Sequence, residues 1–249
     1  MLDIATRIAL GPLLLAQANR LRRTALELPE PHGPRSGRVG RGDPVLRLLV
    51  AGDSSAAGVG ARTQREALAL PLAERLARRL DRAVRWQLVA ESGLTSEGVL
   101  QRLIRARPRP ADVALIVVGV NDITKDVPLA FALRQRQHIA DWLHVHADVR
   151  HVVFPAVPEM ETFPAVPKPL SWYAGQAARR NNRAQARWAA KQTRVSHAVM
   201  DGVARSDLFC EDGFHPAPAL YARVADRLTE HIIAVALAAA APESTTETP

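Results

Sequence analysis

Short apolar runs alternate with amphipathic stretches along most of the chain. The runs have the length and composition of buried strands and cover residues 46–52, 84–90, 111–118, 152–156 and 198–201. Between them, apolar residues recur every three or four positions, as they do on one face of a helix. The run at 111–118 is almost continuously apolar, which is typical of a central parallel strand buried on both faces. The alternation predicts an α/β fold in which helices cover both faces of a parallel sheet.

The first 23 residues combine apolar and basic character. The apolar run at 2–18 is too short for a membrane span and is broken by charges and by Pro12. Residues 16–18 have the small-x-small form of a signal-peptide cleavage site, so a secreted or periplasmic protein is one alternative. We expect instead an uncleaved amphipathic helix. It either covers part of the core or contacts a membrane through residues 1–23, and the protein is then cytoplasmic or peripheral to a membrane.

Composition divides the chain into four parts. Residues 1–28 form the apolar and basic helix, and 29–44 are rich in Pro, Gly and Arg, which is the composition of a linker. Residues 45–241 carry the α/β pattern, and the polar segment 242–249 is expected to be a disordered tail. A chain of 249 residues with 47% hydrophobic content is long enough for one such domain and too short for two.

The net charge of +8 raises the question of an anionic partner such as nucleic acid. The aromatic content is only 4%, with no base-stacking cluster and no zinc-finger spacing, so we do not expect nucleic acid to bind. Much of the charge lies on one face of a predicted helix between 180 and 194, where basic side chains are normally solvated. The single cysteine, Cys210, excludes an internal disulfide and fits a reducing compartment.

The strand at 46–52 leads into a tight turn of small residues that carries Ser54. The turn has neither the lysine of a phosphate-binding loop, nor the third glycine of a dinucleotide fingerprint, nor the Gly-x-Ser-x-Gly elbow of α/β-hydrolases. Gly and Ser can serve such a turn for backbone freedom alone. Ligands of open α/β sheets, however, bind at the carboxyl ends of the strands. Ser54 is therefore our candidate nucleophile, with Ser55 as the adjacent alternative.

Other polar residues follow the neighbouring strands or precede the last helix. Gly93 and Asn121 come after the second and third strands, and Asp212 and His215 stand just before the final helix. Because parallel strands end at one edge of a sheet, these residues can converge on Ser54. A serine hydroxyl needs a base to remove its proton, and imidazole titrates near pH 6.5.

The spacing of these residues predicts a role for each. Three residues separate Asp212 from His215, so the carboxylate can hold Nδ1–H while Nε2 faces Ser54. Donors for the oxyanion of a tetrahedral intermediate are the N–H groups of Ser54 and Gly93 and the side-chain amide of Asn121. Four histidines, at 138, 144, 146 and 151, lack a carboxylate or cysteine at matching spacing, so we expect surface residues and neither a metal nor a cofactor.

Four sequence blocks together resemble those of the SGNH hydrolases, also called GDSL-type esterases and lipases. They are Gly52-Asp53-Ser54, Gly93, Gly119-Val120-Asn121-Asp122 and Asp212-Gly213-Phe214-His215-Pro216, in the family's order. The resemblance covers about residues 45–240, with Ser55 standing where the family name has leucine. It implies a flavodoxin-like three-layer αβα sandwich with about five parallel strands. It also implies a Ser54 nucleophile, an Asp212–His215 pair and an oxyanion hole from Ser54, Gly93 and Asn121.

The function expected from these residues is serine-dependent hydrolysis of a small-molecule carboxylic ester through an acyl-enzyme intermediate. Loop 155–169 and the turn after Gly58 are expected to shape the acyl pocket. The resemblance leaves two alternatives on the same site, which are carbohydrate O-deacetylation and acyl transfer. A non-enzymatic alternative is a basic, membrane-associated binding protein that uses its first 23 residues.

Overall fold

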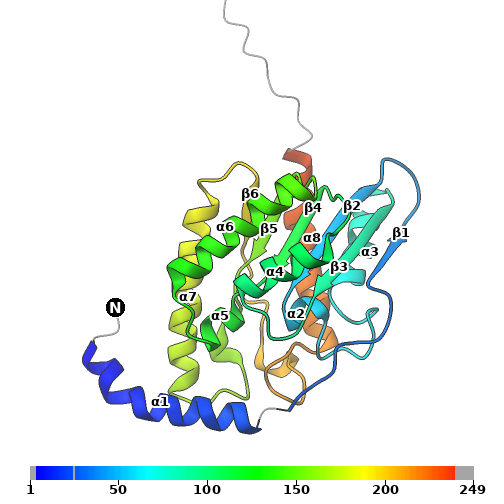
Figure 1. The fold of residues 1–249 in the computed structure, drawn as a ribbon. Helices are drawn as coiled ribbons and strands as arrows, with labels where there is room; N and C mark the ends of the chain where they lie inside the picture. The colour runs from blue at the N-terminus through cyan, green and yellow to red at the C-terminus, as the bar shows by residue number, and fades with distance from the viewer. Residues whose placement is uncertain (1–3, 25, 239–249) are drawn as a thin grey trace, which may run out of the picture.

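The computed structural model describes residues 4–24 and 26–238, so the predicted tail at 242–249 lies outside the described residues. A six-stranded sheet forms the middle layer, in the order β1-β3-β2-β4-β5-β6 (Figure 1). Its strands are β1 (Ser36–Val39), β2 (Leu46–Gly52), β3 (Val84–Ala90), β4 (Val113–Val117), β5 (His151–Pro155) and β6 (Val195–Ala198). The five from β2 to β6 pair in parallel, and β1 pairs antiparallel with β3. When β1 is left out and the five parallel strands are renumbered from 1 to 5 along the chain, their order in the sheet is 2-1-3-4-5. This is the flavodoxin-like order that the resemblance implies.

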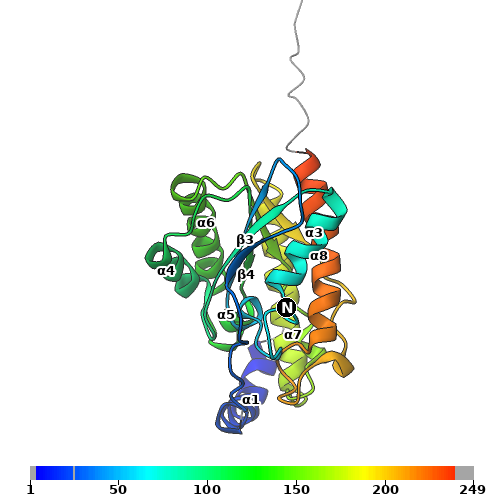
Figure 2. The same ribbon diagram turned by 90° about the vertical axis from the view of Figure 1, so that its right-hand side faces the viewer.

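Helices cover both faces of the sheet, which confirms the predicted three-layer α/β fold. Figure 2 shows α3 and α8 on one side and α4 and α6 on the other. The helices are α1 (Ile4–Thr24), α2 (Ser54–Ala57), α3 (Ala69–Leu80), α4 (Ser96–Ala106), α5 (Val120–Thr124), α6 (Leu129–His146), α7 (Leu170–Ala189) and α8 (Pro218–Ala238), with short 3₁₀ turns at Met160–Thr162 and Ser206–Leu208.

The central strand β2 explains why the apolar runs are continuous. Alternate side chains of a strand point to opposite faces of the sheet. Leu48 and Val50 pack in the core beneath α3 and α8, whereas Leu49 and Ala51 pack in the core beneath α4 and α6. Helices exclude water from both faces here, so each position from Leu48 to Ala51 needs an apolar side chain, whereas Arg47 near the start of the strand is only partly buried.

The segment 29–44 differs from the linker that its composition predicts, because it contains β1 and adds an edge strand to the sheet. Its residues pair with β3 from Ser36 opposite Gln87 to Val39 opposite Val84. Backbone hydrogen bonds hold an edge strand without large apolar side chains, so no hydrophobic pattern marks it. A smaller difference is β6, which begins at Val195 and ends at Ala198, ahead of the predicted 198–201, because polar Ser196 and His197 interrupt the apolar pattern there.

Helix α1 lies at the end of the molecule to which the carboxyl ends of the parallel strands point (Figure 1). It is attached to the start of α7 by the side chain of Gln17, which donates to the carbonyl oxygen of Lys168 and accepts from the N–H of Leu170. From Leu10 onward, none of its described side chains is buried, so the helix covers little of the core. No helix within residues 4–24 and 26–238 is both long and apolar enough to cross a membrane.

Candidate active site

Ser54 is the first residue of α2, directly after the turn that ends β2. Gly52 has φ +153°, and a Cβ built on it would lie 2.1 Å from the carbonyl oxygen of Val117, so the close approach of β4 requires glycine there. The carboxylate of Asp53 accepts a hydrogen bond from the N–H of Ser55 at 3.0 Å and thereby caps α2. These contacts present Ser54 at the carboxyl edge of the sheet.

The structure brings Ser54, His215 and Asp212 into one line of hydrogen bonds. His215 Nε2 lies 2.9 Å from Ser54 Oγ, and His215 Nδ1 lies 2.5 Å from Asp212 Oδ2. The other carboxylate oxygen, Oδ1, accepts the N–H groups of Phe214 and His215 at 2.9 Å each. Because a carboxylate only accepts, Nδ1 carries the proton and Nε2 is free to take the one from Ser54.

Asn121 lies in α5 and lines the same cavity as Ser54 and His215. Its side-chain Nδ2 donates to the carbonyl oxygen of Leu94 at 3.1 Å, which orients the amide and leaves its second N–H for a substrate oxygen. Gly93 is not among the residues that line this cavity. Its carbonyl oxygen accepts from Lys125 Nζ at 2.7 Å, so the loop that carries Gly93 is joined to the segment that carries Asn121.

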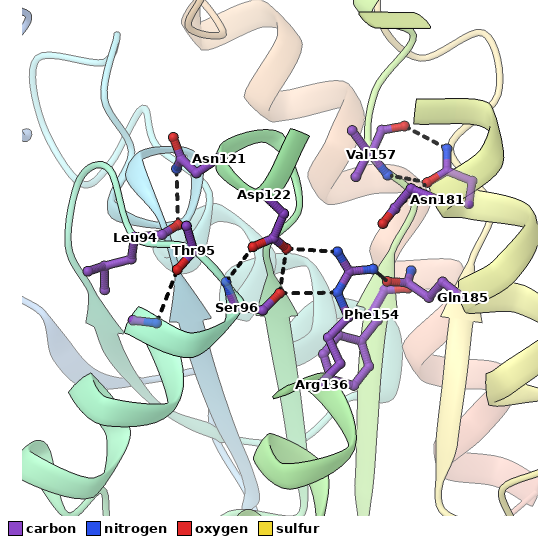
Figure 3. Close-up of polar contacts among 12 residues, drawn as sticks. Leu94, Thr95, Ser96, Asn121, Asp122, Arg136, Phe154, Val157, Asn181 and Gln185 are labelled. Atoms are coloured by element: carbon purple, nitrogen blue, oxygen red, sulfur yellow. Dashed lines mark hydrogen bonds and ion pairs between the residues drawn. The ribbon is translucent and has the colours of Figure 1, made fainter. Parts of the chain in front are cut away.

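A buried polar network lies next to the segments that carry Asn121 and Leu94, as Figure 3 shows. Asp122 accepts from Ser96 and from Arg136, and Arg136 also donates to Gln185. The sequence analysis missed Arg136, although a signal was present. Arg136 is the charged residue at a position where helical periodicity places the apolar face of α6, four residues after Ala132 and before Ala140.

Beside Ser54 the structure encloses a cavity of about 100 Å³, several times the space that one water molecule occupies. Val157, Pro158 and Phe163 line it, as predicted for loop 155–169. The turn after Gly58 does not line the cavity, which corrects the expectation for that segment. Side chains after β6 and from α8 occupy this part of the wall instead, because α8 packs across the sheet close to Ser54; they are Met200, Val203, Phe209, Leu220, Val224 and Leu228.

Burial alters the titration of two groups near the nucleophile. Asp53 is 2% exposed, and its burial raises the pKa of its carboxyl from 3.8 to about 7. Burial likewise raises the pKa of the Cys210 thiol, whose Sγ lies 3.2 Å from the carbonyl oxygens of Gly60 and Pro216. Asp53 caps α2 and is among the residues that line the cavity, whereas Cys210 lies in the turn that precedes His215.

The histidines that we expected at the surface divide into two pairs. His138 and His146 are exposed, whereas His144 and His151 are half-buried. Burial lowers the pKa of His151 to about 4. Within the described part of the chain, no group of three His, Cys, Asp or Glu residues is arranged to hold a metal ion.

Comparison with known proteins finds relatives in sequence and in fold. A GDSL-like esterase of Mycobacterium tuberculosis is 28% identical over 194 residues, which are 74% of this chain and 60% of the relative's length. A lipase from a goat rumen metagenome shares the fold with a TM-score of 0.61 and 16% identity, over 74% of this chain and 96% of that one. An acetylxylan esterase of Geobacillus stearothermophilus shares the fold with a TM-score of 0.55 and 16% identity, over 78% of this chain and 95% of that one.

Residues 50–223 match the sequence profile of the family described as "GDSL-like Lipase/Acylhydrolase". The matched segment contains all four blocks and every predicted site residue. It confirms the resemblance drawn from those blocks. The chain belongs to the GDSL-like lipase/acylhydrolase family, which is a family of ester hydrolases.

Proposed function

We propose that this protein hydrolyses carboxylic esters through an acyl-enzyme intermediate on Ser54. The observation that carries the proposal is the line of hydrogen bonds from Asp212 through His215 to Ser54, which opens onto an apolar cavity. A serine is a weak nucleophile by itself, and this arrangement supplies the adjacent base that it needs.

In the first half of the reaction, Ser54 Oγ attacks the ester carbonyl carbon while His215 Nε2 takes its proton. Asp212 keeps the imidazole in the required tautomer and stabilises the imidazolium. The N–H of Ser54 stands at the start of α2, where a backbone N–H has no acceptor within the helix. We assign this group, the Asn121 amide and the Gly93 N–H to the oxyanion. The alcohol leaves with the proton from His215, and water then releases the acyl group by the same route.

The lining of the cavity supports an apolar acyl group as the part of the substrate held beside Ser54. Most of its side chains are aliphatic or aromatic, as Val157, Phe163, Val224 and Leu228 illustrate. Burying each methylene of a chain there contributes about 0.8 kcal/mol. Esters of medium-length acids are therefore expected to react faster than acetates. Carbohydrate deacetylation and acyl transfer would use the same nucleophile, and a preference for acetyl esters would favour the former.

The test is hydrolysis of p-nitrophenyl esters from acetate to palmitate by the wild type, by Ser54→Ala and by Ser55→Ala. We expect Ser54→Ala to lower kcat by more than about 1,000-fold. Ser55→Ala is the matched control, because its hydroxyl is one residue away, and it should retain most of the activity. Comparable turnover by Ser54→Ala, or loss of turnover only in Ser55→Ala, would contradict the proposed nucleophile.

We also propose that α1 contacts the surface of an anionic membrane. Leu13 and Leu15 are 46% and 66% exposed, and Arg20 and Arg23 are exposed further along the helix. Exposed leucines can enter the acyl region of a bilayer, and exposed arginines can contact its anionic headgroups. The helix also lies at the end of the molecule that carries the active site (Figure 1).

Sedimentation with vesicles of phosphatidylcholine, with and without phosphatidylserine, tests this contact. Binding should require phosphatidylserine, weaken with salt and be lost in Leu13→Asp/Leu15→Asp. Wild-type protein that stays in the supernatant with both vesicles would contradict the contact. Binding by an inactive wild type would instead favour the membrane-associated binding protein.

A further inference from the structure

A buried cation lies below the part of the site that is assigned to the oxyanion. The side chain of Arg136, in the middle of α6, is 0% exposed, and that of Asp122 is 3% exposed. Among the ion pairs of residues 4–24 and 26–238, this is the one in which both side chains are buried. Removing two charges from water is unfavourable unless their remaining donors and acceptors are satisfied. The fold therefore retains the pair against a desolvation penalty.

Arg136 reaches three different segments of the chain with its planar guanidinium (Figure 3). Nη2 donates to Asp122 Oδ2 at 3.0 Å, Nε donates to Ser96 Oγ at 3.2 Å and Nη1 donates to Gln185 Oε1 at 2.6 Å. Gln185 in turn donates to the carbonyl oxygen of Pro155 at 3.0 Å, at the end of β5. The fork geometry of arginine suits this task, because lysine presents a single ammonium and cannot reach three acceptors in one plane.

Asp122 and Ser96 are the residues that link this network to the oxyanion donors. Asp122 directly follows Asn121 on α5, and Ser96 opens α4 three residues after Gly93. Asp122 Oδ1 accepts the N–H of Ser96 at 2.9 Å, and Oδ2 accepts the Ser96 hydroxyl at 2.6 Å. Together with the bond from Asn121 to Leu94, these contacts hold the two donor segments side by side.

The charge of Arg136 keeps the hydrogen bonds between Asp122 and Ser96 in one geometry. Asp122 has its two oxygens committed to the N–H and hydroxyl of Ser96 and to the guanidinium, so it serves only as an acceptor. Without the guanidinium, Asp122 would be an unpaired buried carboxylate. Its side chain would then turn away or water would enter beside it, and either change would disturb its bonds to Ser96.

We propose that Arg136 is a positioning residue for ester hydrolysis. By holding Asp122 and Ser96, it sets the places of the Asn121 amide and the Gly93 N–H, the groups that receive the oxyanion. This inference rests on the proposed function of the same site. It assigns to Arg136 an effect on the transition state rather than on substrate binding, because the oxyanion exists only after attack.

The test uses Arg136→Lys and the pair Arg136→Met/Asp122→Asn, each in the wild type and in Asn121→Ala. The pair removes both charges together, so no unpaired charge stays buried and the protein can fold even where a single substitution cannot. The matched control is Arg47→Met/Asp112→Asn. It deletes an ion pair of 2.7 Å between Arg47, near the start of β2, and Asp112, directly before β4, so the pair lies at the end of these strands that is remote from the site.

Measurements of kcat and KM for a p-nitrophenyl ester, with the thermal unfolding midpoint, give the readout. We expect the Arg136 variants to lower kcat about 100-fold and to change KM less than about 3-fold. In Asn121→Ala the fold-loss should be smaller, because one of the two groups that Arg136 positions is already gone and only the Gly93 N–H remains to be displaced. The control pair should lower the unfolding midpoint and leave kcat unchanged.

An equal fold-loss of kcat in both backgrounds, or a loss no larger than that of the control pair, would overturn the positioning role and leave the proposed function intact. A wild type without Ser54-dependent ester hydrolysis would overturn the proposed function and this inference with it.

Discussion

Asp212→Asn should abolish most activity because the structure forces the amide into the unproductive orientation. Asp212 Oδ1 accepts two backbone N–H groups at 2.9 Å, whereas Oδ2 faces Nδ1 of His215 at 2.5 Å. An asparagine keeps the two backbone bonds only if its oxygen replaces Oδ1. Its NH₂ then faces Nδ1, which must give up its proton, and Nε2 carries the proton instead. A protonated Nε2 cannot accept the proton of Ser54.

The size of the expected loss in kcat follows from the two backbone hydrogen bonds to Oδ1. The flipped amide, which would restore the productive tautomer, loses both of them at about 1 kcal/mol each. A difference of about 2 kcal/mol leaves about 3% of molecules in the flipped state, since 1.4 kcal/mol is a factor of ten. Even these molecules lack the carboxylate that stabilises the imidazolium. The combined loss in kcat should be about 10,000-fold, the scale seen when an aspartate of this type becomes asparagine.

The assay compares kcat of the wild type, Asp212→Asn and Asp212→Ala with a short-chain p-nitrophenyl ester, together with thermal unfolding. Asp212→Ala is the matched control, because it deletes the backbone bonds yet imposes no tautomer on His215. We expect the asparagine variant to unfold at the higher temperature and to be no faster than the alanine variant. An asparagine variant within about tenfold of the wild type would refute the tautomer argument.

Three further predictions concern stability and can be checked by urea unfolding. Gly52→Ala should lower the free energy of unfolding by about 3 kcal/mol or more, because the new Cβ would meet the Val117 carbonyl. The control Gly202→Ala, where φ is +68° and nothing lies near the new Cβ, should lower it by only about 1–2 kcal/mol. Similar losses at both glycines would contradict the clash. The folded protein holds a proton on Asp53 up to about pH 7, while the unfolded chain releases it near pH 4, so the contribution of Asp53 to the free energy of unfolding declines as pH rises between those values. Asp53→Asn should remove that decline, and an unchanged pH dependence of stability in this variant would refute the raised pKa. The half-buried His151 has the opposite effect on stability, because the unfolded chain takes up its proton near pH 6.5 and the folded chain only near pH 4. The free energy of unfolding should therefore fall as pH falls from 6.5 to 4, and it should fall less in His151→Phe. An equal fall in both proteins would contradict the lowered pKa of His151.

Local patterns in the sequence determined the framework of the fold and most of the site. The apolar runs and the glycine turns depend on the backbone and on neighbouring residues, so they place Ser54 at a strand end without any tertiary information. Asp212 and His215 lie in one turn, and their pairing follows from that spacing. The order of the four blocks was sufficient to indicate the family.

Tertiary structure decided the features that depend on partners far apart in the chain. The sequence alone shows β1 as a linker, because its pairing with β3 uses backbone groups that every residue has. The wall formed by α8 depends on how that helix crosses the sheet. The sequence pattern places Arg136 on the apolar face of α6, but only the folded chain shows that Asp122 and Ser96 are its partners. Charge burial is tolerated only when its partners are assembled, and only the folded chain assembles them.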